Sequence, residues 1–189
     1  MFILYNLENY ITMNRLKYIL LLFLMLSPAK FYGQYFKKLT MKDGLSSPSV
    51  LAIYQDTLGR MWFGTNEGVN VYDSKQISKY KSYDIIDYQH RRKNLINGVV
   101  NQIIGDSNGD ILMLNSGALI KYDIRKERFK ELVPVGVGAL AALDGEIWCT
   151  VRDTLFRYDT DTDSLCFYRK LDVASVMCME MSDRKIWIG

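Results

Sequence analysis

The chain has 189 residues, 49% of them hydrophobic and 13% aromatic, which is enough apolar material for a buried core. Two of its three net positive charges lie in residues 1–33, and the remainder holds 21 basic against 20 acidic residues. This balance removes the electrostatic case for nucleic acid or an anionic membrane as a partner, and a single His excludes a multi-histidine metal site.

Residues 1–33 predict an N-terminal extension followed by a secretory signal peptide. Positive charge precedes an uninterrupted apolar run at 18–26, and small residues follow it. The run is too short for a spanning helix. Cleavage after Ala29 or after Gly33 fits the pattern, and Met13 is as good a start as Met1. We therefore expect a periplasmic protein with no membrane span beyond this signal peptide.

After the leader, short runs rich in β-branched and aromatic residues alternate with turn residues, which predicts strands. The run at 34–40 predicts one outer strand, and four more runs follow within 50–81. The same unit then recurs, with large residues spaced by 50, 36 and 39 positions and, in the first three copies, a Tyr-Asp pair beginning ten residues later. The repeated positions are Trp62, Leu112, Trp148 and Trp187; Tyr72, Tyr122 and Tyr158; and the turn acids Asp56, Asp106, Asp144 and Asp183.

Repeats of this length are typical of propellers, and no sustained helical spacing of apolar residues follows the leader. We therefore expect an all-β fold over 34–189: an incomplete β-propeller of about three and a half four-stranded blades. The blades are expected near 50–81, 100–131 and 137–169, with an incomplete fourth at 173–189. Because propellers close with four to eight blades, we expect the chain to be a truncated part of a longer protein.

The recurring aromatic residues are interpreted as packing between blades, although exposed aromatics could also form a sugar-binding platform. Loops vary without disturbing a repeated core, so residues specific for a ligand are expected in the variable connections at 82–97 and 132–138. No individual ligand-binding residue can be assigned from the sequence.

Other candidate sites fail on spacing. Cys149, Cys166 and Cys178 lack metal-ligand spacing and are expected to be buried free thiols, with their redox state open. The acidic run at 159–163 lacks the Gly and the Glu of a calcium loop, so it predicts a polar turn. Nothing around His90 resembles a nucleophile elbow. We predict no catalytic residue, no metal and no cofactor.

The segments GLSSPSV at 44–50, GRMWFGTN at 59–66 and GVNVYD at 68–73 resemble the two-component regulator propeller repeat. That repeat occurs in the sensor regions of hybrid two-component proteins of Bacteroides-type bacteria. The resemblance implies a non-catalytic, extracytoplasmic sensor segment whose parent binds a ligand, commonly a carbohydrate fragment, and relays its presence to a kinase. The partners it implies are that ligand and the remaining blades. Kinase, receiver and DNA-binding parts are absent from this sequence, so their activities are not carried over.

Two other functions stay open. An exported propeller enzyme, such as a polysaccharide lyase or glycosidase, needs acids and bases placed in a shared pocket, whereas the acids here lie mainly in repeated turns. A stand-alone propeller scaffold would instead assemble through the open edges of the arc.

Overall fold

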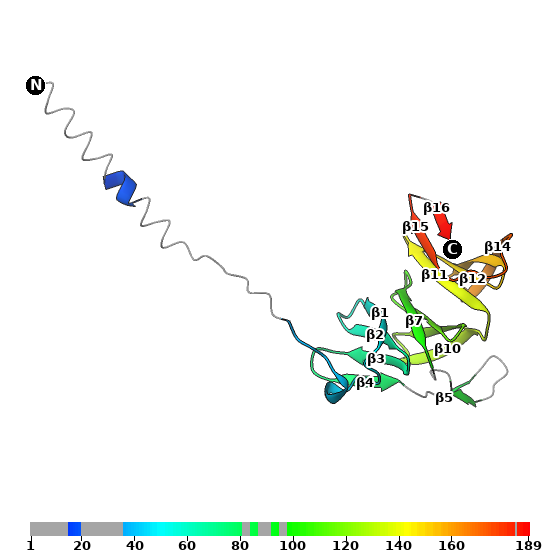
Figure 1. Cartoon of the computed structure of the whole chain (residues 1–189), viewed down its shortest axis with the longest axis horizontal. Coiled ribbons are helices and arrows are strands. Elements are labelled where there is room, and N and C mark those ends of the chain that lie inside the picture. The colour runs from blue at the N-terminus through cyan, green and yellow to red at the C-terminus, as the bar shows by residue number, and fades with distance from the viewer. Residues whose placement is uncertain (1–14, 20–35, 81–83, 87–91, 95–97, 184) are drawn as a thin grey trace, which may run out of the picture. The chain divides into compact units, whose positions relative to one another are not determined.

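The computed structural model of the chain describes residues 15–19, 36–80, 84–86, 92–94, 98–183 and 185–189 (Figure 1). Residues 15–19 are helical and belong to a first unit that ends at Lys38, while Leu39 to Gly189 form the second. No helix within the described ranges is long and apolar enough to cross a membrane. The two expected cleavage sites lie outside those ranges.

The described part of the second unit forms three four-stranded antiparallel sheets and two hairpins (Figure 1). Blade 1 has the strand order β1-β2-β3-β4, blade 2 β7-β8-β9-β10 and blade 3 β11-β12-β13-β14; β15-β16 follows blade 3, and β5-β6 lies between blades 1 and 2. The strands are β1 (Val50–Gln55), β2 (Met61–Thr65), β3 (Gly68–Tyr72), β4 (Ile77–Tyr80), β5 (Asp84–Ile86), β6 (Arg92–Asn94), β7 (Val100–Gly105), β8 (Ile111–Asn115), β9 (Ala118–Asp123), β10 (Arg128–Val133), β11 (Val137–Leu143), β12 (Glu146–Val151), β13 (Thr154–Asp159), β14 (Ser164–Lys170), β15 (Met179–Ser182) and β16 (Lys185–Ile188).

The constant ten-residue spacing in the sequence is a strand register. In each blade the first residue of the Tyr-Asp pair stands opposite the residue before the large repeat position: Met61 with Tyr72, Ile111 with Tyr122, and Ile147 with Tyr158. A shift of one residue would turn every side chain of the strand to the other face. The spacing therefore fixes which side chains face the neighbouring blade.

The Asp of each Tyr-Asp pair closes the turn to the fourth strand. The Oδ1 atoms of Asp73, Asp123 and Asp159 each accept hydrogen bonds from the backbone N–H groups two and three residues further on, at 2.8–3.2 Å. Asp is well suited to this because its short side chain can bond its own backbone. The acidic run at 159–163 accordingly forms a turn between β13 and β14, as expected.

The hydrophobic core lies between blades. One cluster joins blade 1 to blade 2 and includes Trp62, Tyr122 and Phe129, all almost fully buried. A second joins blades 2 and 3 around Leu112 and Tyr158, and a third packs Trp148 of blade 3 against β15-β16. The large repeat positions of the first three copies thus serve to pack one blade against the next.

The first and last repeats differ from the blades between them. Trp187, the fourth large repeat position, is 59% exposed because its side of β16 faces no further blade in the described structure. The outer strand expected at 34–40 is not formed over its described part, residues 36–40. A strand needs a neighbouring strand for its backbone hydrogen bonds, and no described strand pairs with residues 36–40.

The segment before β1 is anchored to blade 1. A single turn of 3-10 helix, η1 (Met41–Asp43), is capped by Thr40 and ends at Gly44, whose φ of 117° favours glycine. Ser46 then donates from its backbone N and its hydroxyl to the Oδ1 of buried Asn70, at 3.0 and 2.8 Å. The segment therefore extends the core of blade 1 toward the N-terminus.

Candidate functional site

The turns of the blades gather on two opposite edges because the strands run antiparallel. One edge holds the turns between second and third strands, at 66–67, 116–117 and 152–153, and the described ends of the links between blades, at 98–99, 134–136 and 171–178. We call it the connection edge. The turn edge holds the remaining turns, at 56–60, 106–110, 144–145, 73–76, 124–127 and 160–163.

Backbone hydrogen bonds tie the links of the connection edge to the neighbouring turns. Gly68 N donates to Gly98 O at 2.8 Å, and Ser116 N donates to Val99 O at the same distance. Further along, Val137 N donates to Gly117 O at 2.9 Å. Of the two segments expected to carry ligand contacts, 132–138 lies on this edge, and residues 84–86 and 92–94 are the described part of 82–97, in the link that follows β4.

The two segments differ in how much surface they offer. Residues 132–133 and 137–138 belong to strands, so Pro134 and Val135 form the exposed tip of the shorter segment. The longer segment contains the paired strands β5 and β6, in which Asp84 stands opposite Asn94. His90 lies outside the described residues. The longer segment therefore contributes the larger added element at this edge.

On the turn edge of blade 1, Asp56 is a buried acceptor for the whole turn. Its Oδ2 accepts from the indole Nε1 of Trp62 at 2.8 Å and from Arg60 Nε at 2.7 Å, while its Oδ1 accepts from two backbone N–H groups. Burial alone would raise the pKa of Asp56, but the hydrogen bonds from Trp62 and Arg60 outweigh it and lower that pKa.

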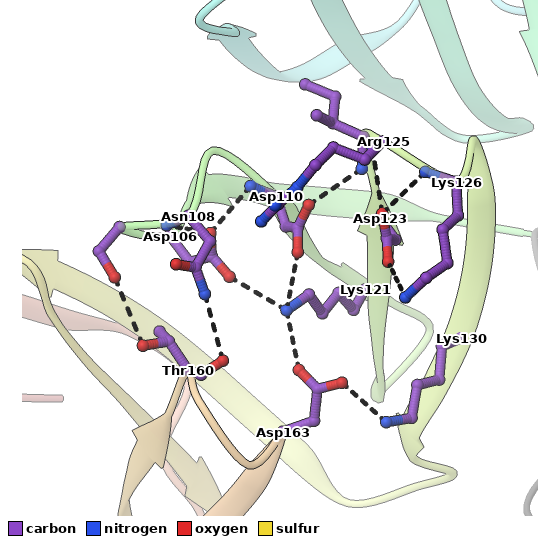
Figure 2. Close-up of polar contacts among 12 residues, drawn as sticks. Asp106, Asn108, Asp110, Lys121, Asp123, Arg125, Lys126, Lys130, Thr160 and Asp163 are labelled. Carbon is purple, nitrogen blue, oxygen red and sulfur yellow. Dashed lines mark hydrogen bonds and ion pairs between the residues drawn. The ribbon is translucent and has the colours of Figure 1, made fainter.

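In blade 2 the buried turn aspartate has a different partner. Leu112 replaces Trp and has no N–H, yet Asp106 is retained, and the ammonium group of Lys121 lies 3.2 Å from its Oδ2 as an ion pair without hydrogen-bond geometry. The same ammonium is 2.9 Å from Asp110 Oδ2 and 2.8 Å from Asp163 Oδ1 (Figure 2). Lys121 is only 5% exposed. A buried cation thus stands where blade 1 uses an indole.

This cluster also joins two blades, since Asp163 lies on blade 3. Its Oδ1 accepts from the hydroxyl of Tyr158 at 2.7 Å, and its Oδ2 accepts from Lys130 of blade 2 at 2.8 Å. Nearby, Asn108 Nδ2 donates to Thr160 O at 3.3 Å (Figure 2). We call the set of Asp106, Asp110, Lys121, Lys130, Tyr158 and Asp163 the interblade junction.

The charges of the interblade junction stabilise one another. Burial opposes the charge of Lys121, but hydrogen bonds to Asp163 and Asp110 outweigh it and raise the pKa of Lys121. Burial likewise opposes ionisation of Asp163, and donation from Lys121, Lys130 and Tyr158 lowers its pKa well below the ordinary value. Burial and the bond to Asp163 raise the pKa of Tyr158. A carboxylate that is held ionised in this way, as in Asp163, is a poor general acid.

The turn acids of the third and fourth copies have another role. Asp144 and Gly145 have φ values of 51° and 83°, which form the two-residue turn expected from the sequence, and Asp183 has a φ of 49°. Both aspartates are exposed. The repeated acid is therefore a buried acceptor in blades 1 and 2 and a backbone element in the later copies.

Sequence reasoning missed the interblade junction. The available signal was a mismatch, because Leu112 removes an N–H donor while Asp106 is kept, and Lys121 appears at the facing position of the next strand. The expectation of three buried thiols is wrong for two of them: Cys149 is buried, Cys166 half-buried and Cys178 exposed. The described residues contain no group of acids, His and Cys that could hold a metal ion.

Comparisons with known proteins agree with this geometry. The two-component regulator propeller family matches residues 44–67, which include Gly44, the buried Ser46, β1 and β2. A 47-residue stretch is 43% identical to histidine kinase P4 of Formosa agariphila and covers 25% of this chain and 3% of the kinase. The chain therefore spans a small fraction of that relative.

Solved structures give the fold over most of the chain. The extracellular domain of a hybrid two component system from B. thetaiotaomicron matches with a TM-score of 0.64 and 21% identity, over 81% of this chain and 23% of that domain. Virginiamycin B lyase from Staphylococcus aureus matches with a TM-score of 0.50 and 15% identity, over 74% of this chain and 48% of the lyase.

Blades packed face to face, with a repeated aromatic core and loops on two edges, define the described part of this chain as blades of a β-propeller. Within that class, residues 44–67 match the two-component regulator propeller repeat, and the fold is similar to that of the extracellular domain of a hybrid two component system.

Proposed function

We propose that residues 34–189 form a non-catalytic, ligand-binding propeller segment of an extracytoplasmic sensor in a hybrid two-component signalling protein. The observation that carries this proposal is the family match at 44–67, because those residues form a structural unit of blade 1. Similarity to histidine kinase P4 over a short stretch supports it. Residues 1–33 are proposed to be the extension and signal peptide that direct the segment to the periplasm.

The ligand is proposed to be a carbohydrate fragment bound at the connection edge. On the turn edge, Asp56 and the interblade junction make structural hydrogen bonds and ion pairs, so these polar groups are engaged within the fold. The connection edge instead carries the β5-β6 hairpin, an element that blades 2 and 3 lack within the described residues. Rigid strands below variable loops are the usual way a repeated scaffold displays a binding surface.

Binding can be tested by calorimetric titration of the protein with a panel of neutral and uronic-acid oligosaccharides. We expect one class to bind, and replacement of residues 82–97 by Gly-Ser-Gly to remove that binding while the melting temperature stays close to that of the unaltered protein. A matched control inserts two glycines in the 124–127 turn on the opposite edge and keeps binding. Binding that survives loss of 82–97 contradicts the assignment to this edge.

The same panel tests the alternative of a polysaccharide-cleaving enzyme, for which the fold similarity to virginiamycin B lyase is the specific observation. A lyase or glycosidase would release unsaturated or reducing products from polymeric substrates. We expect binding without product, because the carboxylates of buried Asp56 and half-buried Asp163 have lowered pKa values and accept hydrogen bonds within the fold. Release of product at a steady rate would refute the non-catalytic assignment.

A further inference from the structure

The turn between β7 and β8, residues 106–110, contains an exposed Asn-Gly pair that the proposed function does not use. Asn108 lies beside Asp106 and faces Thr160 of blade 3 (Figure 2). Gly109 follows with a φ of 83°, in the left-handed region that favours glycine. Because glycine has no side chain, its backbone nitrogen can reach the side-chain carbonyl carbon of the preceding asparagine. An Asn-Gly pair is therefore the sequence in which asparagine loses ammonia most readily.

The reaction at this pair needs water and nothing else. The backbone nitrogen of Gly109 forms a bond to Cγ of Asn108, and the bond from that Cγ to Nδ2 breaks. The proton of Gly109 N passes through solvent to the departing nitrogen, which leaves as ammonia. Water then opens the succinimide ring at either of its two carbonyl groups. The product is an aspartate or an isoaspartate at position 108, with no change of oxidation state.

Hydrogen bonds hold both reacting groups in the folded protein. Gly109 N donates to Asp106 O at 3.1 Å, which closes the turn, and Asn108 Nδ2 donates to Thr160 O at 3.3 Å. The second bond is longer than the usual range for N–H···O bonds. A local opening of this exposed turn frees both groups without unfolding a blade. The reaction should therefore proceed in the folded chain, more slowly than in the unfolded one.

Other asparagines in the described strands lack this combination. Asn101 is exposed but lies within β7, where Gln102 follows it, and Asn115 is almost fully buried before Ser116. A side chain on the following residue hinders the approach of its backbone nitrogen, so Asn101 and Asn115 serve as internal controls. A second Asn-Gly pair, at 97–98, begins outside the described residues and is distinguished by its position in the sequence.

Position 108 lies beside the interblade junction, so a new charge there acts on the contact between blades. The three carboxylates of the junction face two ammonium groups. An aspartate at position 108 adds a further carboxylate and leaves the surroundings of Lys121 more negative. The donor to Thr160 O is lost at the same time, since a carboxylate offers only acceptors. Both changes weaken the contact of blade 2 with blade 3.

We propose that Asn108 of the folded protein is a site of spontaneous deamidation, and that the aspartate or isoaspartate so formed loosens the contact between blades 2 and 3. The modification requires no enzyme and no cofactor. Each chain that has reacted carries an altered interblade junction, so the modified fraction grows with the age of the protein. This inference does not depend on which ligand the sensor binds.

The modification itself is tested on the full chain, incubated in mildly alkaline buffer with and without urea. Tandem mass spectrometry of proteolytic fragments follows the loss of ammonia and gain of water at each asparagine. We expect conversion of Asn108 in the native sample, about tenfold slower than in urea, and none at Asn101 or Asn115 over the same period. Conversion of Asn108 in urea alone overturns the proposal. Equal rates in the two samples also overturn it, because the folded turn would then have no influence.

The effect on the blades is tested with two variants. Asn108→Asp introduces the charge of the product, whereas Asn108→Gln keeps an amide and disfavours ring closure. Alkylation of Cys149, which is buried between blades 2 and 3, reports the opening of their contact. We expect native Asn108→Asp to be labelled several-fold faster than native Asn108→Gln, and added salt to reduce this difference. Equal labelling rates overturn the proposal. Oligosaccharide titration of the same samples scores the sensor function separately.

Discussion

The indole Nε1 of Trp62 donates to the carboxylate of Asp56 at 2.8 Å, which joins the second strand of blade 1 to the turn that precedes it. Trp62 is fully buried and Asp56 nearly so. The pair shows that the repeated Trp and the repeated Asp of the first copy are one interaction. In blade 2 the partner of the Asp changes to Lys121, and the role persists.

Trp62→Phe should destabilise the protein by about 2 kcal/mol, because it removes a hydrogen bond to a buried carboxylate and part of the interblade packing. Urea unfolding followed by circular dichroism measures the change. Trp187→Phe is the control: this Trp is largely exposed, so its replacement should alter the free energy of unfolding by less than about 0.5 kcal/mol. Equal losses in the two variants would contradict the pairing.

Lys121→Met should cost about 3 kcal/mol of stability, since it leaves three carboxylates converging without their buried cation. Lys130→Met removes a neighbouring cation whose side chain is 56% exposed and should cost less than about 1 kcal/mol. Both free energies of unfolding are obtained by urea titration at pH 7. A loss for Lys130→Met as large as that for Lys121→Met would refute the assignment of Lys121 as the centre of the interblade junction.

Acid should weaken the fold through Asp163. Its folded pKa lies below the unfolded value of about 3.9, so its contribution to stability is present above about pH 4 and is lost as the pH falls further. Melting temperatures measured from pH 7 to pH 2 should fall most steeply in the acid part of the range. Asp163→Asn should flatten this dependence. An equally steep acid loss in Asp163→Asn would place the effect elsewhere.

Much of the architecture could be predicted from the sequence because it depends on local rules. Strand positions follow from turn residues, and the ten-residue spacing from Trp62 to Tyr72 is a direct consequence of antiparallel pairing. The interblade junction could not be predicted in the same way. Lys121 and Asp163 are 42 residues apart, and their contact depends on how two blades are rotated against each other. Spacing within one repeat carries no information on that rotation.

The same limit applies at the ends of the arc. A residue pattern predicts that 34–40 favours a strand, but a strand forms only where a partner offers hydrogen bonds. Trp187 likewise matches Trp62 in sequence and differs in burial, because burial of this position is supplied by the following blade. Equivalent sequence positions therefore have equivalent environments only inside the array.

Two glycines are needed for different reasons: Gly64 lies close to the neighbouring blade, whereas Gly145 has a positive φ in a turn. Gly64→Ala should prevent stable folding or cost several kcal/mol, because its Cβ would clash with the backbone of Val100 on the next blade. Gly145→Ala meets no neighbouring atom and changes only a residue with positive φ, so a loss of about 1 kcal/mol is expected. Thermal melting of the two variants makes the comparison. A milder effect at Gly64 than at Gly145 would contradict the close packing of β2 against β7.

Thiol reactivity should follow burial. Cys178 is exposed and should react with iodoacetamide in the native protein, whereas burial raises the pKa of Cys149 to about 12 and keeps it protonated and inaccessible. Alkylation followed by mass spectrometry should modify Cys178 first and Cys149 only on addition of urea. Native-state labelling of Cys149 at a rate close to that of Cys178 would show that the interface between blades 2 and 3 opens readily.

The link between β4 and β7 starts and finishes at points that the blades themselves hold in place, through contacts such as Gly68 N to Gly98 O. Closing a longer loop between fixed anchors adds only about 0.6 kcal/mol for each doubling of its length. Insertions here therefore cost little stability. An insertion or deletion of one residue within β2 or β3 would instead turn every following side chain of that strand to the other face. New surface can therefore be added at this link without changing the contacts that determine the fold.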